Sequence, residues 1–396
     1  MSDTRAWISA AEAAAELNVS RATLYAYVSR GLLESRAQHG SRKRLYAAAD
    51  IRRLRSAGDG GGQPERVLDF GTPLLDSAIT LIDGGRLYYR GRDAVALAAG
   101  ASLETVAGLL WEVDEDPFDG IGIEPQPPIA PGIAGAIARL AVAGRTDMAA
   151  YARTPAALAR TGARIVGHLV SVWSDGAAPA GPAHRALATA WGVPAAAEAI
   201  RTALVLCADH ELNASTFAVR VAASTRTTPY AAVIAGLATL EGPRHGGMTP
   251  QVLAMLQDAV RLGDGRAAVT DRLRRGEALP GFGHRLYPAG DPRAAAIVAA
   301  VQAATGPQPL LTVAEAAAEA GFEATGLRPN LDFGLATLAA NWSLDADRAI
   351  GIFAIGRSVG WLAHAAEQLG TGTLIRPRAR YTGPDPRPAH ANRARS

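Results

Sequence analysis

The sequence predicts a mainly α-helical protein, and three observations support this fold class. Of the 396 residues, 48% are hydrophobic and only 19% are charged, a composition that supports a large buried core and excludes global disorder. From residue 131 onward, segments rich in alanine, leucine and valine recur, and most are bounded by proline or glycine, as helices are. After residue 89 the sequence shows no alternation of strands and helices, so a parallel sheet is not expected.

A glycine-rich break divides the chain into two parts of unequal length. Residues 57–65 contain four glycines and one proline, which cannot hold regular structure and therefore predict a linker. We expect a small domain over residues 1–56, a larger region over 66–386 and a basic tail over 387–396.

The first part has the pattern of a winged helix-turn-helix domain. Ser9-Ala-Ala-Glu12 predicts a capping box at the start of a helix over residues 10–17. A second helix is expected over residues 20–29, after a short turn. The basic run over residues 36–46 predicts a wing, and Asp50 is expected to cap a last helix.

This order of elements resembles the DNA-binding domain of MerR-type regulators. Residues 1–56 contain ten arginines and lysines and five acidic residues, an excess that suits contacts with DNA phosphates. The contacts expected from the resemblance are Arg21, Thr23, Tyr25, Arg42, Lys43 and Arg44. The alternative is a small module that packs on the rest of the protein without binding DNA, and the sequence leaves both open.

The larger region is expected to be helical apart from one hairpin. Residues 79–89 contain two short β-prone runs on either side of Asp83-Gly84-Gly85, a favourable hairpin turn. Helices are expected over residues 131–142, 194–206, 230–240, 250–262 and 293–304. Another apolar helical stretch, around 350–366, is interrupted by Arg357, and no uninterrupted apolar run of 18 residues occurs. With no signal-peptide core at the N-terminus either, we expect a soluble, cytoplasmic protein.

Three of the eight histidines lie in unusual surroundings. His210 directly follows an aspartate, while His245 and His284 have glycine neighbours, which suggests a close approach of the backbone to a ligand. A histidine beside glycine is more often an ordinary loop residue, so each is weak evidence by itself. Four of the others are interpreted as structural or surface residues: His39, His168, His184 and His390. His364 is expected to pack, without a chemical role.

Two further residues are informative because of their neighbours. Arg357 stands within the apolar run 350–361, where an unpaired charge would be expensive to bury, so an acid or a ligand must meet it. Cys207 is the only cysteine, and its apolar neighbours predict a buried hydrophobe rather than a nucleophile. Because the sequence has no His-x3-His spacing and no second thiol, no metal site is expected.

Seven motifs in the larger region closely resemble the citrate synthase family. In chain order they are IDGGRLYYRG, DHELNASTFAVRV, GPRHGG, LPGFGHRLYPAGDPR, PNLDF, IGRSVGWLAHAAEQ and IRPRARYTGP. The resemblance spans about residues 68–384. It applies equally to close relatives of citrate synthase, such as the 2-methylcitrate synthases. It implies a large helical domain and a small helical domain, the latter roughly over residues 248–344.

The resemblance implies a role for each member of one set of residues. His245 matches the histidine that hydrogen-bonds the thioester carbonyl of acetyl-CoA, and Asp332 matches the base that removes a methyl proton. His284 matches the residue that polarises the oxaloacetate carbonyl, and His210 matches an oxaloacetate ligand. A free aspartate has a pKa of about 3.9, so Asp332 can act only if a donor stabilises the enolate as it forms.

Arginines and one loop complete the implied site. Arg293, Arg357 and Arg376 match the residues that hold the carboxylates of oxaloacetate, with Arg376 contributed by the other subunit of a homodimer. A loop is expected to contact CoA through its backbone: Leu279, Pro280, Gly281, Phe282 and Gly283. Oxaloacetate binding is expected to close the small domain over the large one. Acetyl-CoA is a substrate in this reaction, which needs no metal and no cofactor.

Two alternatives to the synthesis of citrate from acetyl-CoA stay open. The same site could use propionyl-CoA, because one methylene changes binding by only about 1–3 kcal/mol. The larger region could also be a metabolite sensor for a DNA-binding regulator, although a sensor would not need the base Asp332. The sequence departs from the family at Arg244 and at Met248-Thr249-Pro250, and either change could alter the CoA side of the site.

Overall fold

The computed structural model describes residues 7–17, 24, 27–28, 33–37, 44–47, 50–51, 75–127, 129–243, 245–379 and 381–383. The chain divides into two compact units, Met1–Asp76 and Ser77–Ser396. The predicted linker, the predicted tail and most of the predicted second helix lie outside the described residues, so they stay predictions.

The first unit contains a helix and a three-stranded antiparallel sheet. The strands are β1 (Trp7–Ser9), β2 (Ser35–Ala37) and β3 (Arg44–Ala47), in the spatial order β1-β3-β2. The pairing of β2 with β3 agrees with the predicted wing, whose turn lies outside the described residues. Helix α1 (Ala10–Leu17) follows β1 directly and has the bounds that the sequence predicted.

The start of α1 has the predicted capping box. The backbone N–H of Glu12 donates to Ser9 Oγ over 3.3 Å, and the N–H of Ser9 donates to Glu12 Oε2 over 2.8 Å. A small hydrophobic core of this unit contains Ala13, Leu24, Leu33, Tyr46 and Ile51.

The second unit opens with the predicted hairpin, β4 (Thr80–Asp83) and β5 (Arg86–Tyr89). Gly84 and Gly85 form its turn, with φ of 55° and 75°, a region that glycine enters without steric penalty. A short third strand, β6 (Arg92–Asp93), pairs with β5 and was not expected from the sequence.

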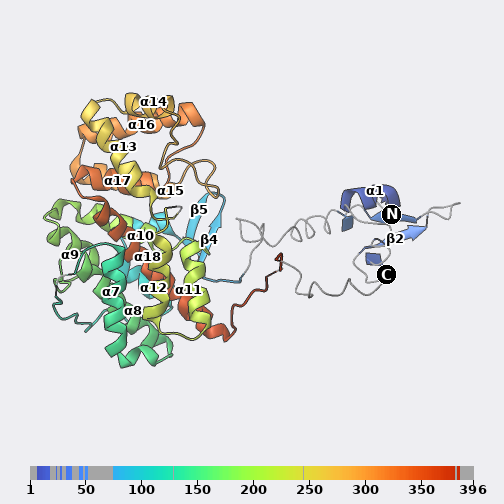
Figure 1. Ribbon diagram of the computed structural model, residues 1–396, viewed down its shortest axis with the longest axis horizontal. Coiled ribbons are helices and arrows are strands. Elements are labelled where there is room, and N and C mark those ends of the chain that lie inside the picture. Colours follow the sequence, from blue (N-terminus) through green and yellow to red (C-terminus); the bar gives the residue numbers. More distant parts are fainter. Residues whose placement is uncertain are drawn as a thin grey trace, which may run out of the picture. The chain divides into compact units, whose positions relative to one another are not determined.

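The other regular elements of the second unit that the structure describes are helices, which confirms the predicted mainly helical fold class (Figure 1). In Figure 1, α13, α14 and α16 gather at one end and α7, α8, α11 and α12 at the other, with α10, α15, α17 and α18 between them. The α-helices are α5 (Ala94–Ala98), α6 (Leu103–Trp111), α7 (Ile133–Thr146), α8 (Pro155–Val172), α9 (Ala183–Ala190), α10 (Ala197–Cys207), α11 (Ala214–Ser224), α12 (Pro229–Leu240), α13 (Met248–Leu262), α14 (Gly265–Arg274), α15 (Pro292–Thr305), α16 (Pro309–Thr325), α17 (Leu331–Asn341) and α18 (Ala346–Thr371).

The five helices predicted by range are all present, with bounds that differ by a few residues. The largest difference is at the end of α7, which extends to Thr146 rather than to residue 142. Helix α10 begins later than predicted because Pro194–Ala196 forms a separate 3-10 turn, η3. A second 3-10 turn, η2 (Met148–Tyr151), follows α7. Prolines at the first turns of α8, α12 and α15 fit helix starts, because a helix leaves its first N–H groups unpaired.

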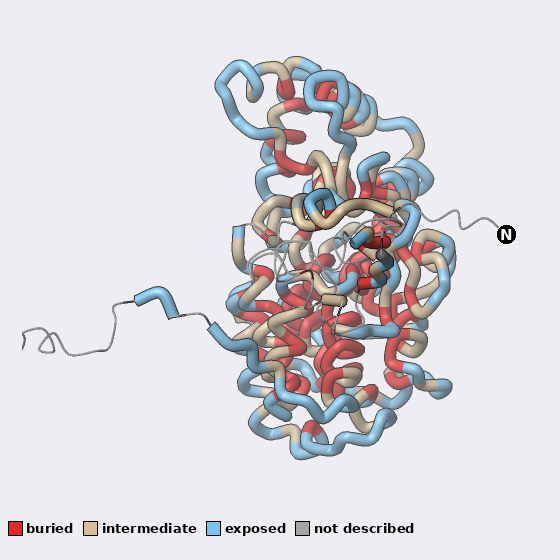
Figure 2. Tube along the Cα trace, turned by 90° about the vertical axis from the view of Figure 1, so that its right-hand side faces the viewer, coloured by how far each residue is buried: buried red, intermediate tan, exposed pale blue. Residues whose placement is uncertain are grey.

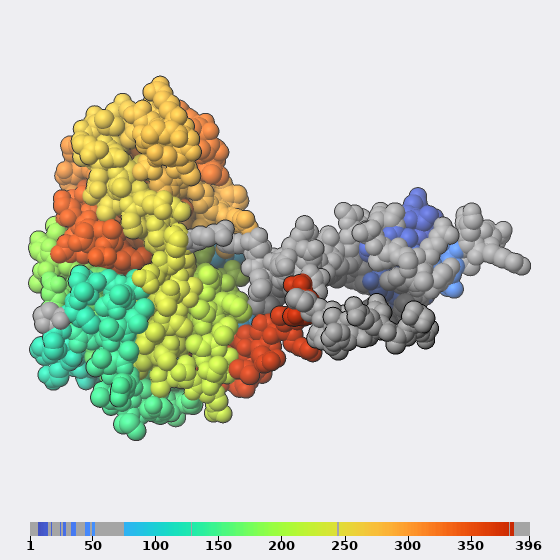
Figure 3. Space-filling model, viewed as in Figure 1, coloured from blue at the N-terminus to red at the C-terminus, as the bar shows by residue number. Residues whose placement is uncertain are grey.

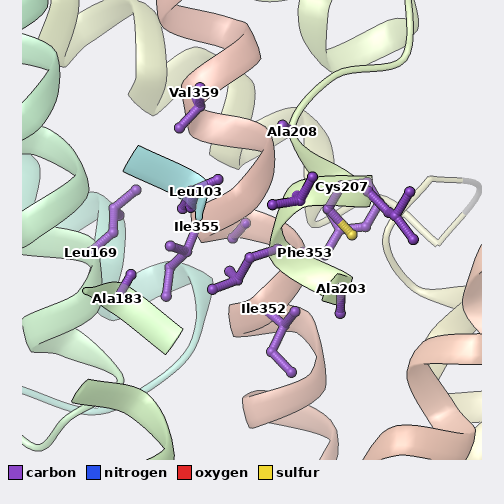
Figure 4. Close-up of a cluster of buried hydrophobic side chains, with 14 of the residues drawn as sticks. Leu103, Leu169, Ala183, Ala203, Cys207, Ala208, Ile352, Phe353, Ile355 and Val359 are labelled. Atoms are coloured by element: carbon purple, nitrogen blue, oxygen red, sulfur yellow. The ribbon is translucent and has the colours of Figure 1, made fainter. Parts of the chain in front are cut away.

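Helix α18 forms the centre of the core, where the tube in Figure 2 is predominantly red. Its side chains pack with residues of α6, α8, α9 and α10, as Figure 4 shows for Ile355, Leu103, Leu169 and Cys207. By length and composition α18 would pass as a membrane span, but 94% of its apolar window is buried inside the protein. It is therefore placed as a core helix.

Two glycines allow α10 to approach α18 closely. A Cβ at Gly356 would lie 2.6 Å from the carbonyl oxygen of Leu204, and one at Gly360 would lie 2.3 Å from that of Ala208. The N–H of Gly360 instead donates to the Ala208 oxygen over 3.0 Å. This contact brings the end of α10, and the segment that follows it, against the middle of α18.

Residues 248–344, the predicted small domain, form α13 to α17 and appear in yellow to orange in Figure 3. A small cluster of Val269, Ala317 and Ala320 lies between α14 and α16, apart from the main core. Side chains of α13 and α17 belong to the main core. The segment therefore has a cluster of its own and also shares the central core.

Candidate active site

The three predicted histidines lie in segments that connect helices. His210 lies between α10 and α11, His245 between α12 and α13, and His284 between α14 and α15. The ring centroids of His210 and His284 are 5.0 Å apart, and His210 Nε2 lies 3.1 Å from the hydroxyl of Tyr287. The structure thus brings His210 and His284 together with a tyrosine that the sequence reasoning did not single out.

The surroundings of His284 determine which ring nitrogen can donate. The N–H of Leu286 donates to His284 Nδ1 over 3.2 Å, so in the neutral ring the proton lies on Nε2. Burial, assisted by the nearby Arg293 cation, lowers the pKa of His284 and keeps the ring neutral. Within the described part of the chain Nε2 has no hydrogen-bonding partner, so it can donate to an oxygen of a ligand.

His245 lies in a tight turn that two glycines make feasible. A Cβ at Gly246 would lie 2.3 Å from the carbonyl oxygen of Leu240, and one at Gly247 would lie 2.7 Å from Pro243 Cα. These glycines are therefore explained by the turn itself rather than by a ligand close to the backbone. Arg244, where the sequence departs from the family, lies outside the described residues.

A serine fixes the ring of His245. Ser215, near the start of α11, places its Oγ 2.7 Å from His245 Nε2 and accepts a hydrogen bond from Trp361 Nε1 over 3.2 Å. Burial, together with the Arg357 cation, lowers the pKa of His245 to about 4, so the ring is neutral at pH 7. Ser215 lies in the motif DHELNASTFAVRV, yet nothing in its type or spacing marks it as a partner of His245.

Asp332 lies in the first turn of α17. Asn330 caps this helix and accepts the N–H of Asp332 over 3.1 Å, and Thr249 Oγ1 donates to Asp332 Oδ1 over 2.6 Å. Burial raises the pKa of Asp332, while the hydrogen bond from Thr249 acts in the opposite direction. The result is a carboxylate that is more basic than an ordinary aspartate.

Arg293 is buried and already has a partner. Its side-chain Nε and Nη2 donate to the two oxygens of Asp291 over 2.9 and 2.7 Å, and Asp291 Oδ2 also accepts the N–H of Leu331 over 3.1 Å. Asp291 thereby links the predicted oxaloacetate ligand to the helix that carries Asp332. An aspartate before Pro-Arg is a recognisable N-cap pattern, so the sequence held a signal for Asp291.

Arg357 is also buried, at 1% exposure, but it has no acid beside its terminal nitrogens. Its Nε donates to the carbonyl oxygen of Cys207 over 2.8 Å, and its guanidinium lies 4.7 Å from the ring centroid of Phe353. Nη1 and Nη2 have no hydrogen-bonding partner among the residues that the structure describes. Burial lowers the pKa of Arg357, and the charge of Asp209, which forms no ion pair with it in the described residues, opposes this effect only in part.

Cys207 is buried, in agreement with the sequence prediction. Burial raises the pKa of its thiol to about 12, so the thiolate required of a nucleophile is not formed near neutral pH. Its backbone oxygen, by contrast, orients Arg357.

The predicted CoA loop is fixed against the segment 328–330. Gly283 N donates to Arg328 O over 2.8 Å, Asn330 N donates to Gly281 O over 2.8 Å, and Asn330 Nδ2 donates to Gly283 O over 3.1 Å. Gly281 has a φ of 83°, and a Cβ there would lie 2.7 Å from Val252. Since these backbone groups are engaged, a CoA ligand would have to use others, on Leu279, Pro280 or Phe282.

The remaining predicted residues are not part of this cluster. Arg376 is exposed in the segment that follows α18, and no contact given by the described residues joins it to the histidines. Of the predicted DNA contacts, Arg44 is exposed on β3. The other five lie outside the described residues: Arg21, Thr23, Tyr25, Arg42 and Lys43.

A second buried pair lies next to the cluster. His364 Nε2 is 3.3 Å from Asp209 Oδ2, and both side chains are almost fully buried. His364 was expected only to pack, but it also makes this polar contact. Since Asp209 directly precedes His210, the pair helps to hold the His210 segment against α18.

Neither a group of metal-binding side chains nor a cavity marks the predicted site within the described residues. In the described ranges, no group of three or more His, Cys, Asp or Glu side chains could hold a metal ion. A cavity of about 990 Å³ lies between α6, the segment 112–121 and α8, and it contains none of the predicted site residues. The site is therefore assigned by the convergence of buried polar side chains rather than by cavity size.

The chain resembles known proteins in sequence. It is 44% identical over 191 residues to the citrate synthase of Haloferax volcanii, a match that covers 47% of this chain and 50% of that protein. It is 38% identical over 195 residues to citrate synthase 2 of Bacillus subtilis, covering 48% and 52% respectively. The matched part of the chain thus spans about half the length of these curated relatives.

Solved structures resemble a larger part of the chain. Citrate synthase from Thermotoga maritima matches with a TM-score of 0.65 and 25% identity, covering 79% of this chain and 94% of that one. A ternary complex of citrate synthase from Thermoplasma acidophilum with carboxymethyl coenzyme A and oxaloacetate matches with a TM-score of 0.67 and 25% identity, covering 82% and 97%.

Two family models match separate parts of the sequence. Residues 7–58 match the helix-turn-helix domain, in agreement with the predicted first domain. Residues 140–378 match the citrate synthase C-terminal domain, and this range contains every histidine, aspartate and arginine of the cluster described above. Because this match covers more than half of the 396 residues, the chain belongs to the citrate synthase family.

Proposed function

We propose that the second unit catalyses the condensation of acetyl-CoA with oxaloacetate and water to give citrate and CoA. The observation that carries the proposal is the unpaired guanidinium of Arg357. A buried cation without a counter-ion is unfavourable unless a ligand supplies the opposite charge. A carboxylate of oxaloacetate would meet Nη1 and Nη2 of Arg357, while Arg293, held by Asp291, would favour the second carboxylate.

The two histidines next to the arginines suit the ketone of oxaloacetate. A neutral His284 with its proton on Nε2 would donate to the ketone oxygen and polarise the carbonyl. His210, with a pKa lowered well below the ordinary value by burial and by the two arginine cations, would act as a neutral ligand. The arginines then provide the positive charge, and the histidines provide directional donors.

His245 and Asp332 suit the other reactant. Asp332 would remove a proton from the methyl group of the thioester, and His245 would donate to the thioester oxygen on which negative charge develops. The hydroxyl of Ser215 can donate to Asn213 Oδ1, 2.8 Å away, or to His245 Nε2. In the proposed reaction it donates to Nε2, so that the proton of the neutral ring lies on Nδ1, which is then the donor to the thioester. The enol formed would attack the polarised ketone carbon, and water would hydrolyse the resulting thioester.

Two further features of the proposal concern assembly and motion. Arg376 would complete the oxaloacetate site of a second copy of the chain, consistent with its exposed position outside the cluster. Residues 248–344 would move toward the rest of the unit when oxaloacetate binds, so that water is excluded from the thioester. The reaction requires no metal and no cofactor.

The test is release of free thiol from acetyl-CoA. We expect release only when oxaloacetate is present, because the nucleophile forms productively only beside a bound ketone. A purified protein that releases no thiol with both substrates present would overturn the proposal. The same assay with propionyl-CoA decides between citrate and 2-methylcitrate synthesis, and the larger value of kcat/KM identifies the acyl group.

We also propose that the first unit binds DNA. Its match to the helix-turn-helix domain, its paired strands β2 and β3 and its excess of basic residues support this function. Deletion of residues 1–60 should abolish DNA retention at low salt and leave thiol release nearly unchanged. Absence of DNA binding by the full-length chain at low salt would contradict this second proposal.

A further inference from the structure

We propose that Thr249 is a positioning residue for the base Asp332: its hydroxyl holds carboxylate oxygen Oδ1 and leaves Oδ2 to accept the substrate proton. The inference rests on the condensation proposed above. It goes beyond that proposal because it assigns separate tasks to the two oxygens of one carboxylate. It also assigns a function to a position where the sequence departs from the family.

The geometry around Thr249 is well defined. Thr249 is the second residue of α13 and is 1% exposed, and its Oγ1 lies 2.6 Å from Asp332 Oδ1. This distance is typical of a hydroxyl that donates to an ionised carboxylate. The start of α13 directly follows the turn of His245, Gly246 and Gly247. The hydrogen bond therefore joins the segment that carries His245 to the helix that carries Asp332.

The other oxygen of the carboxylate is free. Oδ2 of Asp332 has no hydrogen-bonding partner within the described ranges. The terminal torsion of an aspartate is soft, so an unrestrained carboxylate would present either oxygen in a range of orientations. A single directional hydrogen bond to Oδ1 removes much of this freedom and lowers the entropy lost when the substrate methyl group is positioned.

The hydrogen bond also adjusts the basicity of Asp332. Burial raises the pKa of this carboxyl, and the donation from Thr249 partly opposes the rise. The carboxyl is therefore less basic than burial alone would make it, and more basic than an exposed aspartate. Two helix N-termini, those of α13 and α17, meet at this carboxylate and favour its negative form.

The test compares three variants of the full-length protein. Thr249→Val removes the hydroxyl with little change in shape, and Thr249→Ser retains it. Thr337→Val is the matched control: it removes a buried hydroxyl of α17 that donates to Phe333 O over 2.8 Å and does not contact Asp332. The measurements are kcat and kcat/KM between pH 5 and pH 9, and a ¹³C NMR titration of the Asp332 carboxyl carbon.

We expect Thr249→Val to lower kcat by roughly 10- to 100-fold, the range for a lost hydrogen bond to a charged group. This loss should persist on the alkaline plateau, where Asp332 is ionised in every variant, and the acid limb should move to higher pH. Thr249→Ser should recover most of the rate, and Thr337→Val should keep the wild-type profile. A plateau kcat and an acid limb of Thr249→Val equal to those of the wild type would overturn the inference.

The NMR titration separates this inference from the proposed function. If the wild type releases no thiol, the condensation proposal fails, and with it the role of Thr249 in that reaction. If the wild type is active but the carboxyl titration and the plateau rate are the same with and without the hydroxyl, only the assignment of Thr249 fails.

Discussion

The surroundings of Asp291 and Asp332 differ sharply, although both carboxylates lie at the start of helices in the same segment of the chain. Asp291 is nearly fully buried and accepts three hydrogen bonds from Arg293, whose charge and donors hold the pKa of Asp291 below the ordinary value despite the opposing effect of burial. Among the described residues, the side chain of Asp332 is met only by the hydroxyl of Thr249, and burial raises the pKa of Asp332. The ion pair with Arg293 keeps Asp291 an anion, whereas Asp332, without such a pair in the described residues, is more basic and suits the role of base that we propose for it.

The two buried arginines differ in the same way. Arg293 has a carboxylate partner that raises its pKa against the effect of burial, whereas Arg357 has none near its terminal nitrogens within the described residues, and burial lowers its pKa. Paired groups in this site hold the structure together, and unpaired groups are free to meet a ligand. This distinction can be tested residue by residue.

The largest expected effect is a loss of kcat when Asp332, the aspartate without an ion-pair partner, is replaced. Asp332→Asn should lower kcat by about 10²- to 10⁴-fold, the contribution typical of a positioned general base. Thiol release with both substrates saturating measures it. The control Asp258→Asn removes an exposed carboxylate of α13 and should leave kcat within twofold of the wild type. Equal rates for Asp332→Asn and the control would remove Asp332 from the mechanism.

Replacement of Asp291, which is paired with Arg293, should affect mainly the free energy of unfolding. Asp291→Asn leaves the buried Arg293 without its anion and should lower the free energy of unfolding by about 3–5 kcal/mol. Urea denaturation checks this, with Asp271→Asn, from an exposed ion pair on α14, as the control that should change by less than 1 kcal/mol. Similar losses in both variants would contradict the comparison.

Replacement of Arg357, which has no ion-pair partner in the described residues, should weaken the binding of oxaloacetate. Arg357→Met keeps an unbranched, flexible side chain and removes the charge, and it should weaken oxaloacetate binding by roughly 10- to 150-fold, as expected for one lost charge-assisted contact. Calorimetric titration of oxaloacetate into the wild type and the variant measures the difference. An unchanged dissociation constant would show that the free guanidinium does not meet the substrate.

The smallest effect concerns pH and the buried histidines. His245 has a pKa of about 4 in the folded protein against about 6.5 in the unfolded chain, so between these values only the unfolded state binds the proton. Stability contributed by the neutral ring is therefore present above pH 6.5 and is lost as the pH falls toward 4. The slope is at most about 1.4 kcal/mol per pH unit for one histidine.

Denaturant unfolding at a series of pH values tests this sign. The variant His245→Gln should show a shallower decrease of stability between pH 6.5 and pH 4 than the wild type. An equal or steeper decrease in the variant would mean that folding does not lower the pKa of His245.

Much of the molecule could be predicted from the sequence because the signals are local. The hairpin needs only Asp83-Gly84-Gly85 between β-prone runs, and the capping box of Ser9 and Glu12 needs four residues. The candidate histidines, Asp332 and the arginines were identified from motifs in family order. Arg357 could be singled out by physical reasoning alone, because it is a charge within an apolar helix.

The partners of the site residues could not be predicted, because they depend on contacts between distant segments. Thr249 and Asp332 are 83 residues apart, and Ser215 and His245 are 30 apart. A threonine or serine in a helix gives no local sign of which side chain it will meet. The glycines that follow His245 illustrate the same limit. The sequence suggested that they let the backbone approach a ligand, whereas the structure shows that a Cβ at these positions would collide with Leu240 and Pro243.

The most direct test of the central claim follows a labelled carbon. Acetyl-CoA carrying ¹³C in its methyl group is incubated with oxaloacetate and the protein, and the products are examined by NMR. We predict that the label appears in a methylene carbon of citrate, formed by a new carbon–carbon bond, and that Asp332→Asn greatly reduces this signal. Labelled free acetate as the product, or unchanged acetyl-CoA, would contradict the account.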